Sequence, residues 1–97
     1  MEIKVIKADK ALVKELGMDS WPVWESPVTE FDWHYDDNET CLFLEGSVTV
    51  KNGASETAIE AGDIAVFPKG LACRWQVHKA VKKHYFFGPV AEKLAAR

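Results

Sequence analysis

The residues best able to do chemistry in this chain lie in two blocks, each of which contains glycine. The first block carries Asp32, His34 and Glu39, and the second ends at Cys73. Carboxylate, imidazole and thiolate groups are all acceptable ligands for Zn, Fe, Mn or Ni in some geometry. If the fold brings these four side chains together, they could hold one divalent metal ion.

A metal-free arrangement of the same residues is equally consistent with their chemistry. Two carboxylates buried together cannot both stay charged and unpaired, because each would carry a desolvation cost of several kcal/mol. One carboxyl could be protonated while the other bonds to Arg74, Tyr35 or a water molecule. Cys73 is then open to three roles: a metal ligand, a nucleophile beside Arg74, or a small thiol in the core.

The remaining candidates are weaker. His78 and His84 lie in lysine-rich stretches that indicate solvated surface, and Cys41 starts an apolar run typical of a core thiol. Trp75 has the same strand parity as Cys73, so it could form the floor of a pocket and stack on a ligand. The alternative is that Trp75 merely fills the core.

The strand expected over Thr29–Tyr35 must position the first block. Side chains alternate across a strand, so Phe31, Trp33 and Tyr35 share one face while Asp32 and His34 share the other. Periodicity alone predicts a half-buried strand whose polar face meets water.

The rest of the chain is rich in short strands and turns. We expect an all-β, antiparallel fold with a short helix between Asp9 and Gly17 and another over Pro89–Arg97. An Asn52-Gly53 turn predicts a hairpin, and the segment over Trp21–Val28, broken by prolines, predicts an edge or wrapping strand. The expected strands are Glu2–Lys7, Thr29–Tyr35, Glu39–Glu45, Ser47–Lys51, Ser55–Glu60, Ile64–Phe67, Ala72–His78 and Lys83–Phe87.

Composition limits the classes of function. A chain of 97 residues with 47% hydrophobic residues can bury one core, so we expect a single domain over residues 1–97 with its central part at about 21–88. A net charge of −3 leaves no basic stripe for nucleic acid. No run approaches the roughly 20 apolar residues that span a membrane. We therefore expect a cytoplasmic protein with free thiols at Cys41 and Cys73.

The two blocks resemble the paired motifs of the cupin superfamily. The first reads Asp32-x-His34-x4-Glu39-x6-Gly46, and the second reads Gly62-x5-Pro68-x-Gly70-x2-Cys73. Asp32 stands where the family usually has its first His, Cys73 replaces the His of the second motif, and Val77 replaces an Asn. Phrases between Trp21 and Tyr85 are similar to small single-domain cupins that share features with the cupin domains of ureidoglycine aminohydrolase.

The resemblance implies a single antiparallel jelly-roll β-barrel. It turns Asp32, His34, Glu39 and Cys73 toward the interior, reversing the face that periodicity predicts, and it covers the aromatic face of the Thr29–Tyr35 strand with Trp21 and Trp24. The implied site holds one divalent metal ion (Mn, Fe, Ni or Zn) beside a pocket containing Trp75 and Tyr35. A homodimer is also expected, because cupin barrels commonly pair.

Two functions remain open at this point. One is a metal-dependent enzyme acting on a small polar metabolite, with the ion as Lewis acid or water activator. The other is a metal-free module that binds a small-molecule ligand through Trp75 and the polar pocket without catalysis.

Overall fold

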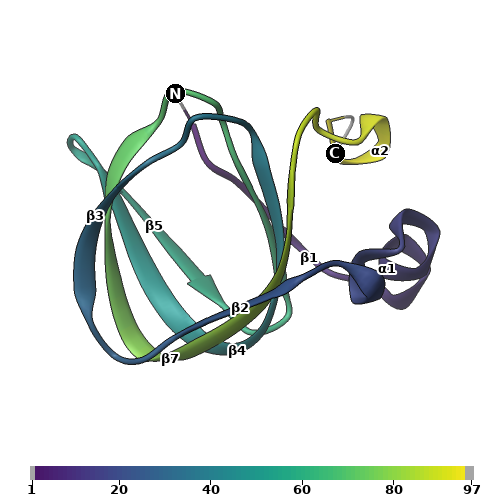
Figure 1. Ribbon diagram of the computed structural model, residues 1–97, viewed down its shortest axis with the longest axis horizontal. Helices are drawn as coiled ribbons and strands as arrows, with labels where there is room; N and C mark the ends of the chain where they lie inside the picture. The colour runs from purple at the N-terminus through teal and green to yellow at the C-terminus, as the bar shows by residue number, and fades with distance from the viewer. Residues whose placement is uncertain (1, 96–97) are drawn as a thin grey trace.

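The structure, a computed structural model, describes residues 2–95 and consists mainly of one antiparallel sheet (Figure 1). Its elements are β1 (Lys4–Lys7), α1 (Lys10–Leu16), the 3-10 helix η1 (Met18–Ser20), β2 (Val23–Ser26), β3 (Glu30–His34), β4 (Glu39–Asn52), β5 (Ser55–Glu60), β6 (Asp63–Phe67), β7 (Ala72–Phe87) and α2 (Glu92–Ala95). No helix among the described residues has the length and apolar character needed to cross a membrane.

Two long strands organise the sheet. β4 and β7 pair with each other along most of their length, whereas the sequence predicted two shorter strands in each segment. The first part of β4 pairs with β6 and its last part with β5. Likewise, the first part of β7 pairs with β3 and its last part with β2. The continuous strands therefore join two halves of one sheet.

The pairing of β4 with β7 is irregular around Gly46 of β4. The register between β4 and β7 shifts at several points between Phe43 and Val48. Gly46 has φ +94°, and a Cβ atom added there would lie 2.3 Å from the carbonyl oxygen of Ala80. Only glycine allows the two backbones to approach this closely, which explains the glycine that ends the first sequence block.

The strands curve around a common interior, as Figure 1 shows in a view along that interior. The sheet order is β1-β6-β4-β7-β2, with β3 added on β7 and β5 added on β4. Within residues 2–95 the hydrogen-bonded pairing does not close into a ring, since β1 and β2 end the path. The antiparallel, mostly β prediction is confirmed, but a closed barrel is not seen.

The interior of the curved sheet holds the larger core. Its buried members alternate along β7, where Cys73, Trp75, Val77 and Val81 face inward. Aromatic rings stack within this core: Tyr35 and Phe67 have centroids 4.9 Å apart and nearly parallel planes. Offset aromatic contacts of this kind add stability beyond the area that they bury.

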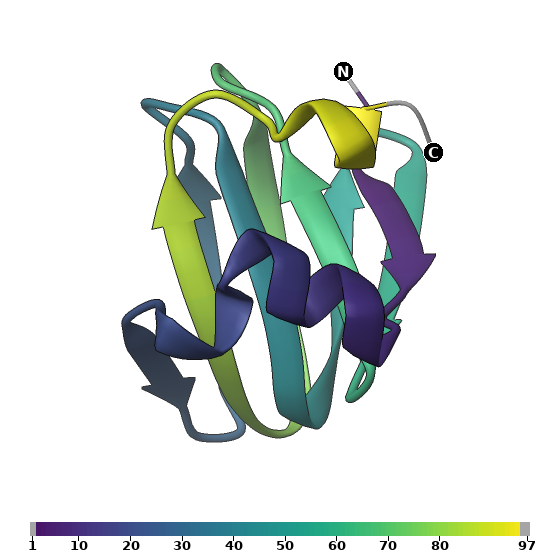
Figure 2. The same ribbon diagram turned by 90° about the vertical axis from the view of Figure 1, so that its right-hand side faces the viewer.

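A second core lies outside the sheet, under the helices. Figure 2 shows α1 crossing the outer face of the strands. Leu12 of α1 and Leu94 of α2 cluster with Leu42, Ile64 and Val66 of β4 and β6. Strand β6 is therefore buried on both faces, which explains the apolar run that follows Asp63.

The predicted ends of α1 are confirmed. The Asp9 side chain accepts a hydrogen bond from the Leu12 amide at 2.7 Å, and Gly17 adopts φ 65° at the C-terminus. At the other end of the chain, α2 is shorter than predicted, and residues 96–97 of the predicted helix lie outside the described range.

Candidate functional site

Strand β3 faces the opposite way from the resemblance-based prediction. Phe31 and Tyr35 pack with the interior core, whereas the side chains of Asp32 and His34 are 82% and 60% exposed. The predicted inward orientation of Asp32 and His34 was wrong. The reason is hydrophobic: turning the strand by one residue would expose its aromatic face and bury two ionisable groups. The alternation of polar and apolar residues alone correctly predicted that the Asp32 and His34 face of this strand meets water.

Asp32 belongs to a surface ion-pair network. The Arg74 guanidinium donates to Asp32 Oδ1 at 2.8 Å and to Glu30 Oε2 at 2.5 Å. Asp32 and Arg74 are register partners on β3 and β7, so their side chains share the outer face. The hydrogen bond from Arg74 holds the pKa of Glu30 below its usual range. Arg74 therefore satisfies the carboxylates without a metal ion.

Three of the four predicted metal ligands, Asp32, His34 and Cys73, line one open hollow, whereas Glu39 lines a different one. His34 Nδ1 lies 3.1 Å from Asp36 on the outer surface, while Glu39 and Cys73 are buried. Within residues 2–95 there is no group of three or more His, Cys, Asp and Glu side chains arranged to hold a metal. The described donors therefore do not fit the metal that the resemblance implied.

Cys73 faces the interior as predicted. It belongs to the large core, directly across from Trp33 in the β3–β7 pairing. Burial raises the pKa of its thiol, so the neutral form predominates near neutral pH. Of the three roles that the sequence left open, this environment favours the core thiol.

A cavity of about 250 Å³ opens beside this core, between β2, β3, β4 and β7. We call it the aromatic cavity. Strands β2 and β3 supply Trp24, Phe31 and Trp33, and Tyr35 follows directly after β3. Burial raises the pKa of the Tyr35 phenol above its ordinary value, and the nearby Glu39 charge adds to the effect. Tyr35 is therefore a neutral hydroxyl in this cavity.

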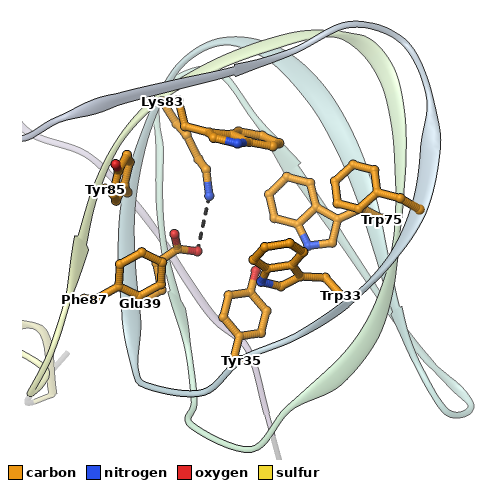
Figure 3. Close-up of a pocket in the computed structure, with 9 residues that line it drawn as sticks. Trp33, Tyr35, Glu39, Trp75, Lys83, Tyr85 and Phe87 are labelled. Atoms are coloured by element: carbon orange, nitrogen blue, oxygen red, sulfur yellow. Dashed lines mark hydrogen bonds and ion pairs between the residues drawn. The ribbon is translucent and has the colours of Figure 1, made fainter.

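The other residues that line the aromatic cavity come from the two long strands. β4 supplies Glu39, and β7 supplies Trp75, Lys83, Tyr85 and Phe87 (Figure 3). Phe87 is 47% exposed, which places it at the mouth of the cavity. The predicted pocket residues Trp75 and Tyr35 thus both line one cavity, although it is not the cavity of a metal site.

Lys83 is the most unusual residue of the aromatic cavity. Its ammonium lies 3.2 Å from Glu39 Oε1 and 3.1 Å from the sulfur of Cys41. The Nζ atom is also 4.9 Å from the ring centroid of Trp24 and 4.8 Å from that of Trp75. Ion pairing and cation–π contacts together compensate the desolvation of the ammonium. Figure 3 shows Lys83 and Glu39 pointing toward one another across this space.

Sequence reasoning missed Lys83 because it lies in a lysine-rich stretch. A usable signal was present: Trp75, Val77, Val81, Lys83 and Tyr85 share one parity along β7, and that parity faces the interior. The neighbouring Lys82 has the opposite parity and lies 4.0 Å from Glu45. Alternation, rather than local charge, decides which lysine is buried.

The aromatic cavity is small and mostly apolar. Its walls are aromatic, two of its lining residues are the tyrosines Tyr35 and Tyr85, and its charged groups are the paired Lys83 and Glu39. Its volume is below the roughly 300–1,000 Å³ of pockets for drug-sized molecules, so a single-ring ligand is the appropriate size.

A curved antiparallel sheet around an interior cavity places this chain among the small β proteins. Comparison with family models then identifies the family to which the chain belongs. The chain matches the family model of the EutQ-like cupin domain over residues 13–85 and belongs to that family. A DUF861-family protein from Thermotoga maritima is 49% identical, with a TM-score of 0.87, and the match covers 90% of this chain and 100% of that one.

More distant solved structures share the fold. The EutQ protein of Clostridium difficile is 21% identical with a TM-score of 0.64, covering 69% of this chain and 53% of that one. A putative ethanolamine utilization protein Q from Salmonella typhimurium is 18% identical with a TM-score of 0.62, covering 94% of this chain and 72% of that one. No protein with a curated description matches the sequence. Function must therefore be argued from the site itself.

Proposed function

We propose that the protein is a metal-free binding protein that holds one small molecule in the aromatic cavity. The observation that carries this proposal is the position of Lys83. Its ammonium supplies the positive charge inside the curved sheet, and Glu39 compensates that charge at 3.2 Å. A divalent ion at this position would have to displace the ammonium or lie beside it, against Coulomb repulsion.

The lining supports binding of a ring compound. Trp24 and Phe31 contact edge to face, with centroids 6.3 Å apart, and Phe31 stacks on Trp75 at 5.8 Å. These contacts fix the ring orientations before any ligand arrives, so little conformational entropy is lost on binding. A preformed cavity with few polar groups is the usual form of a small-molecule site.

A metal-dependent enzyme remains the second candidate from the sequence. It requires Asp32 and His34 to leave the outer surface and join Glu39 and Cys73 inside. The described structure offers no observation that favours this rearrangement, and Arg74 would lose its carboxylate partner Asp32.

The test is a thermal-shift screen of single-ring compounds against untagged protein, with and without chelator. A compound present at a hundred times its Kd should stabilise the protein by about 2.7 kcal/mol. We expect at least one such compound, with the same shift in chelator. Lys83→Met should abolish the shift, whereas Lys82→Met, which changes the neighbouring lysine on the other face, should keep it.

Two results would overturn the proposal. If no compound stabilises the wild-type protein, the cavity is packing space rather than a binding site. If stabilisation by a compound disappears in chelator, the site works through a metal ion and the metal-dependent candidate replaces this one.

A further inference from the structure

The charge of Lys83 is already compensated within the protein. Within residues 2–95 its hydrogen bonds go to Glu39 Oε1 at 3.2 Å and to Cys41 Sγ at 3.1 Å. An ammonium paired in this way attracts an anionic ligand only weakly, because Glu39 repels the second negative charge. Replacing a whole buried ion pair by apolar residues of similar volume is often neutral for stability. Neither recognition of an anion nor stability of the fold therefore explains why a lysine occupies this position.

The Nζ atom of Lys83 lies at the border between the large core and the aromatic cavity. Two of its ring neighbours, Phe43 and Phe67, belong to the core, and each ring centroid is 5.8 Å from Nζ. The other two, Trp24 and Trp75, line the cavity, with centroids at 4.9 and 4.8 Å. Lys83 itself lines the cavity, and Figure 3 shows its side chain pointing into the space that the lining residues surround. A small ligand that enters the cavity thus meets this side chain.

Lys83 supplies the amine of the cavity lining, and an amine is a nucleophile once it has lost its proton. The hydroxyls of Tyr35 and Tyr85 also line the cavity, and burial raises the pKa of Tyr35, so this residue stays a neutral phenol. Cys41 contacts Lys83 but belongs to the core, and burial raises the pKa of its thiol, which therefore stays protonated. Lysine amines in apolar enclosures form Schiff bases with carbonyl compounds.

Glu39 is placed to move the protons that such a reaction requires. The Lys83 nitrogen attacks only after a proton has left it, and Glu39 Oε1, 3.2 Å away, is close enough to accept that proton. The carboxyl group can then return the proton to the oxygen of the adduct. The Tyr35 and Tyr85 hydroxyls can form hydrogen bonds with the same oxygen, but the proton balance does not need them.

We propose that Lys83 forms a reversible imine with a small aldehyde or ketone bound in the aromatic cavity. The amine nitrogen attacks the carbonyl carbon, so a C–N bond forms and the π electrons of the C=O bond move to the oxygen, which takes the proton held by Glu39. A second proton then passes from nitrogen through Glu39 to the hydroxyl group. The C–O bond breaks, water leaves and the C=N bond forms. The net reaction converts an ammonium and a carbonyl into an iminium and water, with Glu39 again a carboxylate.

The product keeps the electrostatics of the site. The iminium nitrogen carries the positive charge that the ammonium had, so Glu39 still compensates it and the Trp24 and Trp75 rings still lie beside it. A neutral carbonyl compound also brings no charge into the cavity, whose volume of about 250 Å³ suits a single ring. This inference rests on the proposed function, because it gives the ligand class and the mode of binding for that same cavity.

The experiment uses benzaldehyde as the probe and sodium cyanoborohydride to reduce any iminium to a stable secondary amine. Intact-mass measurement counts the benzyl groups on each chain, and tandem mass spectrometry of peptides distinguishes Lys83 from Lys82. With equimolar benzaldehyde at neutral pH, we expect one benzyl group, located on Lys83. It should form at least about tenfold faster there than on any other amine of the protein, because Glu39 assists the proton transfers.

Variants test the amine and its proton acceptor separately. Lys82→Met is the matched control and should be labelled as the wild type is, because Lys82 lies 4.0 Å from Glu45 on the opposite face. Lys83→Arg keeps a cation beside Glu39 but has no amine, so the label should disappear. Glu39→Gln should slow the labelling of Lys83 about a hundredfold. If Lys83→Arg or Glu39→Gln does not fold, the peptide map of the wild-type protein still decides.

Benzyl alcohol, which has the same ring but no carbonyl, separates this inference from the proposed function. If benzyl alcohol raises the Tm of the wild-type protein while benzaldehyde labels Lys83 no faster than the surface lysines, the imine is wrong and the binding site stands. Labelling of Glu39→Gln at the wild-type rate would overturn the role of Glu39. If Lys83 is unlabelled and neither benzyl alcohol nor the thermal-shift screen stabilises the protein, both this inference and the proposed function fail.

Discussion

Lys83 Nζ and Glu39 Oε1 are 3.2 Å apart, and the two side chains are only 5% and 7% exposed. A buried ion pair of this kind is strongly destabilised when one partner is removed, because the other charge is left uncompensated. Lys83→Met alone should therefore lower the free energy of unfolding by about 3 kcal/mol. Urea denaturation at neutral pH measures the loss.

The double variant is the informative control for this pair. Lys83→Met combined with Glu39→Gln removes both charges, so it should be more stable than the sum of the single losses predicts. Lys82→Met, on the opposite face, should change stability by less than about 0.5 kcal/mol. Strictly additive losses would show that the two charges do not interact in solution.

Gly46 and Gly62 form a matched pair for testing how closely the β4 backbone approaches Ala80 of β7. Their φ angles are +94° and +93°, but an added Cβ would meet the Ala80 backbone at Gly46 and nothing within 4 Å at Gly62. Gly62→Ala should cost about 1–2 kcal/mol for backbone strain alone. Gly46→Ala should cost at least about 2 kcal/mol more, because backbone must also shift. Equal losses in urea denaturation would contradict the close approach.

Cys41 should make the protein less stable at alkaline pH. Burial raises the pKa of its thiol above the ordinary value of 9.0, although Lys83 opposes the rise. The folded state thus keeps a proton that the unfolded state loses above about pH 9. Stability is unaffected by this group below that pH and falls above it, by about 1.4 kcal/mol per pH unit for one proton.

Cys41→Ala removes this contribution. Its stability at pH 8 will be lower because of the vacated volume, but its decline between pH 9 and about pH 10.5 should be shallower than that of the wild type. The same decline in stability is measured for Cys73→Ala, because burial also raises the pKa of the Cys73 thiol. If the free energy of unfolding of Cys41→Ala falls with pH as steeply as that of the wild type, another group causes the loss of stability at alkaline pH.

Self-association stays a prediction. Trp24 contacts Phe31 on the aromatic face of β3, as the resemblance implied, and also Trp75, whereas Trp21 packs on Phe86 rather than on that strand. The large exposed aromatics are instead Trp33 at 50%, Phe86 at 44% and Phe87 at 47%. We expect sedimentation experiments at protein concentrations on the order of tens of micromolar to show a homodimer, provided that the interface is of standard size. The Phe86→Ser variant should shift the equilibrium toward monomer. A strict monomer would contradict this expectation.

The sequence predicted the elements better than the site. Turn residues and alternation placed the strands and the caps of α1, because these signals act locally. The face of β3 depended on whether its aromatic or its polar residues met the interior, and periodicity answered correctly for Asp32 and His34 where family analogy did not. Lys83 was missed because its stabilisation comes from Glu39, distant in sequence, and from rings on other strands, none of which a local charge pattern records.

The most direct test of the account is metal titration of untagged, chelator-stripped protein. Mn, Fe, Ni and Zn are added separately, metal uptake is measured by elemental analysis, and thermal melts follow stability. We predict no stoichiometric uptake and no rise in Tm, with His34→Ala behaving as the wild type does, because His34 lies on the outer surface. One equivalent of metal that raises the Tm, and that is lost in both His34→Ala and Cys73→Ala, would contradict the account.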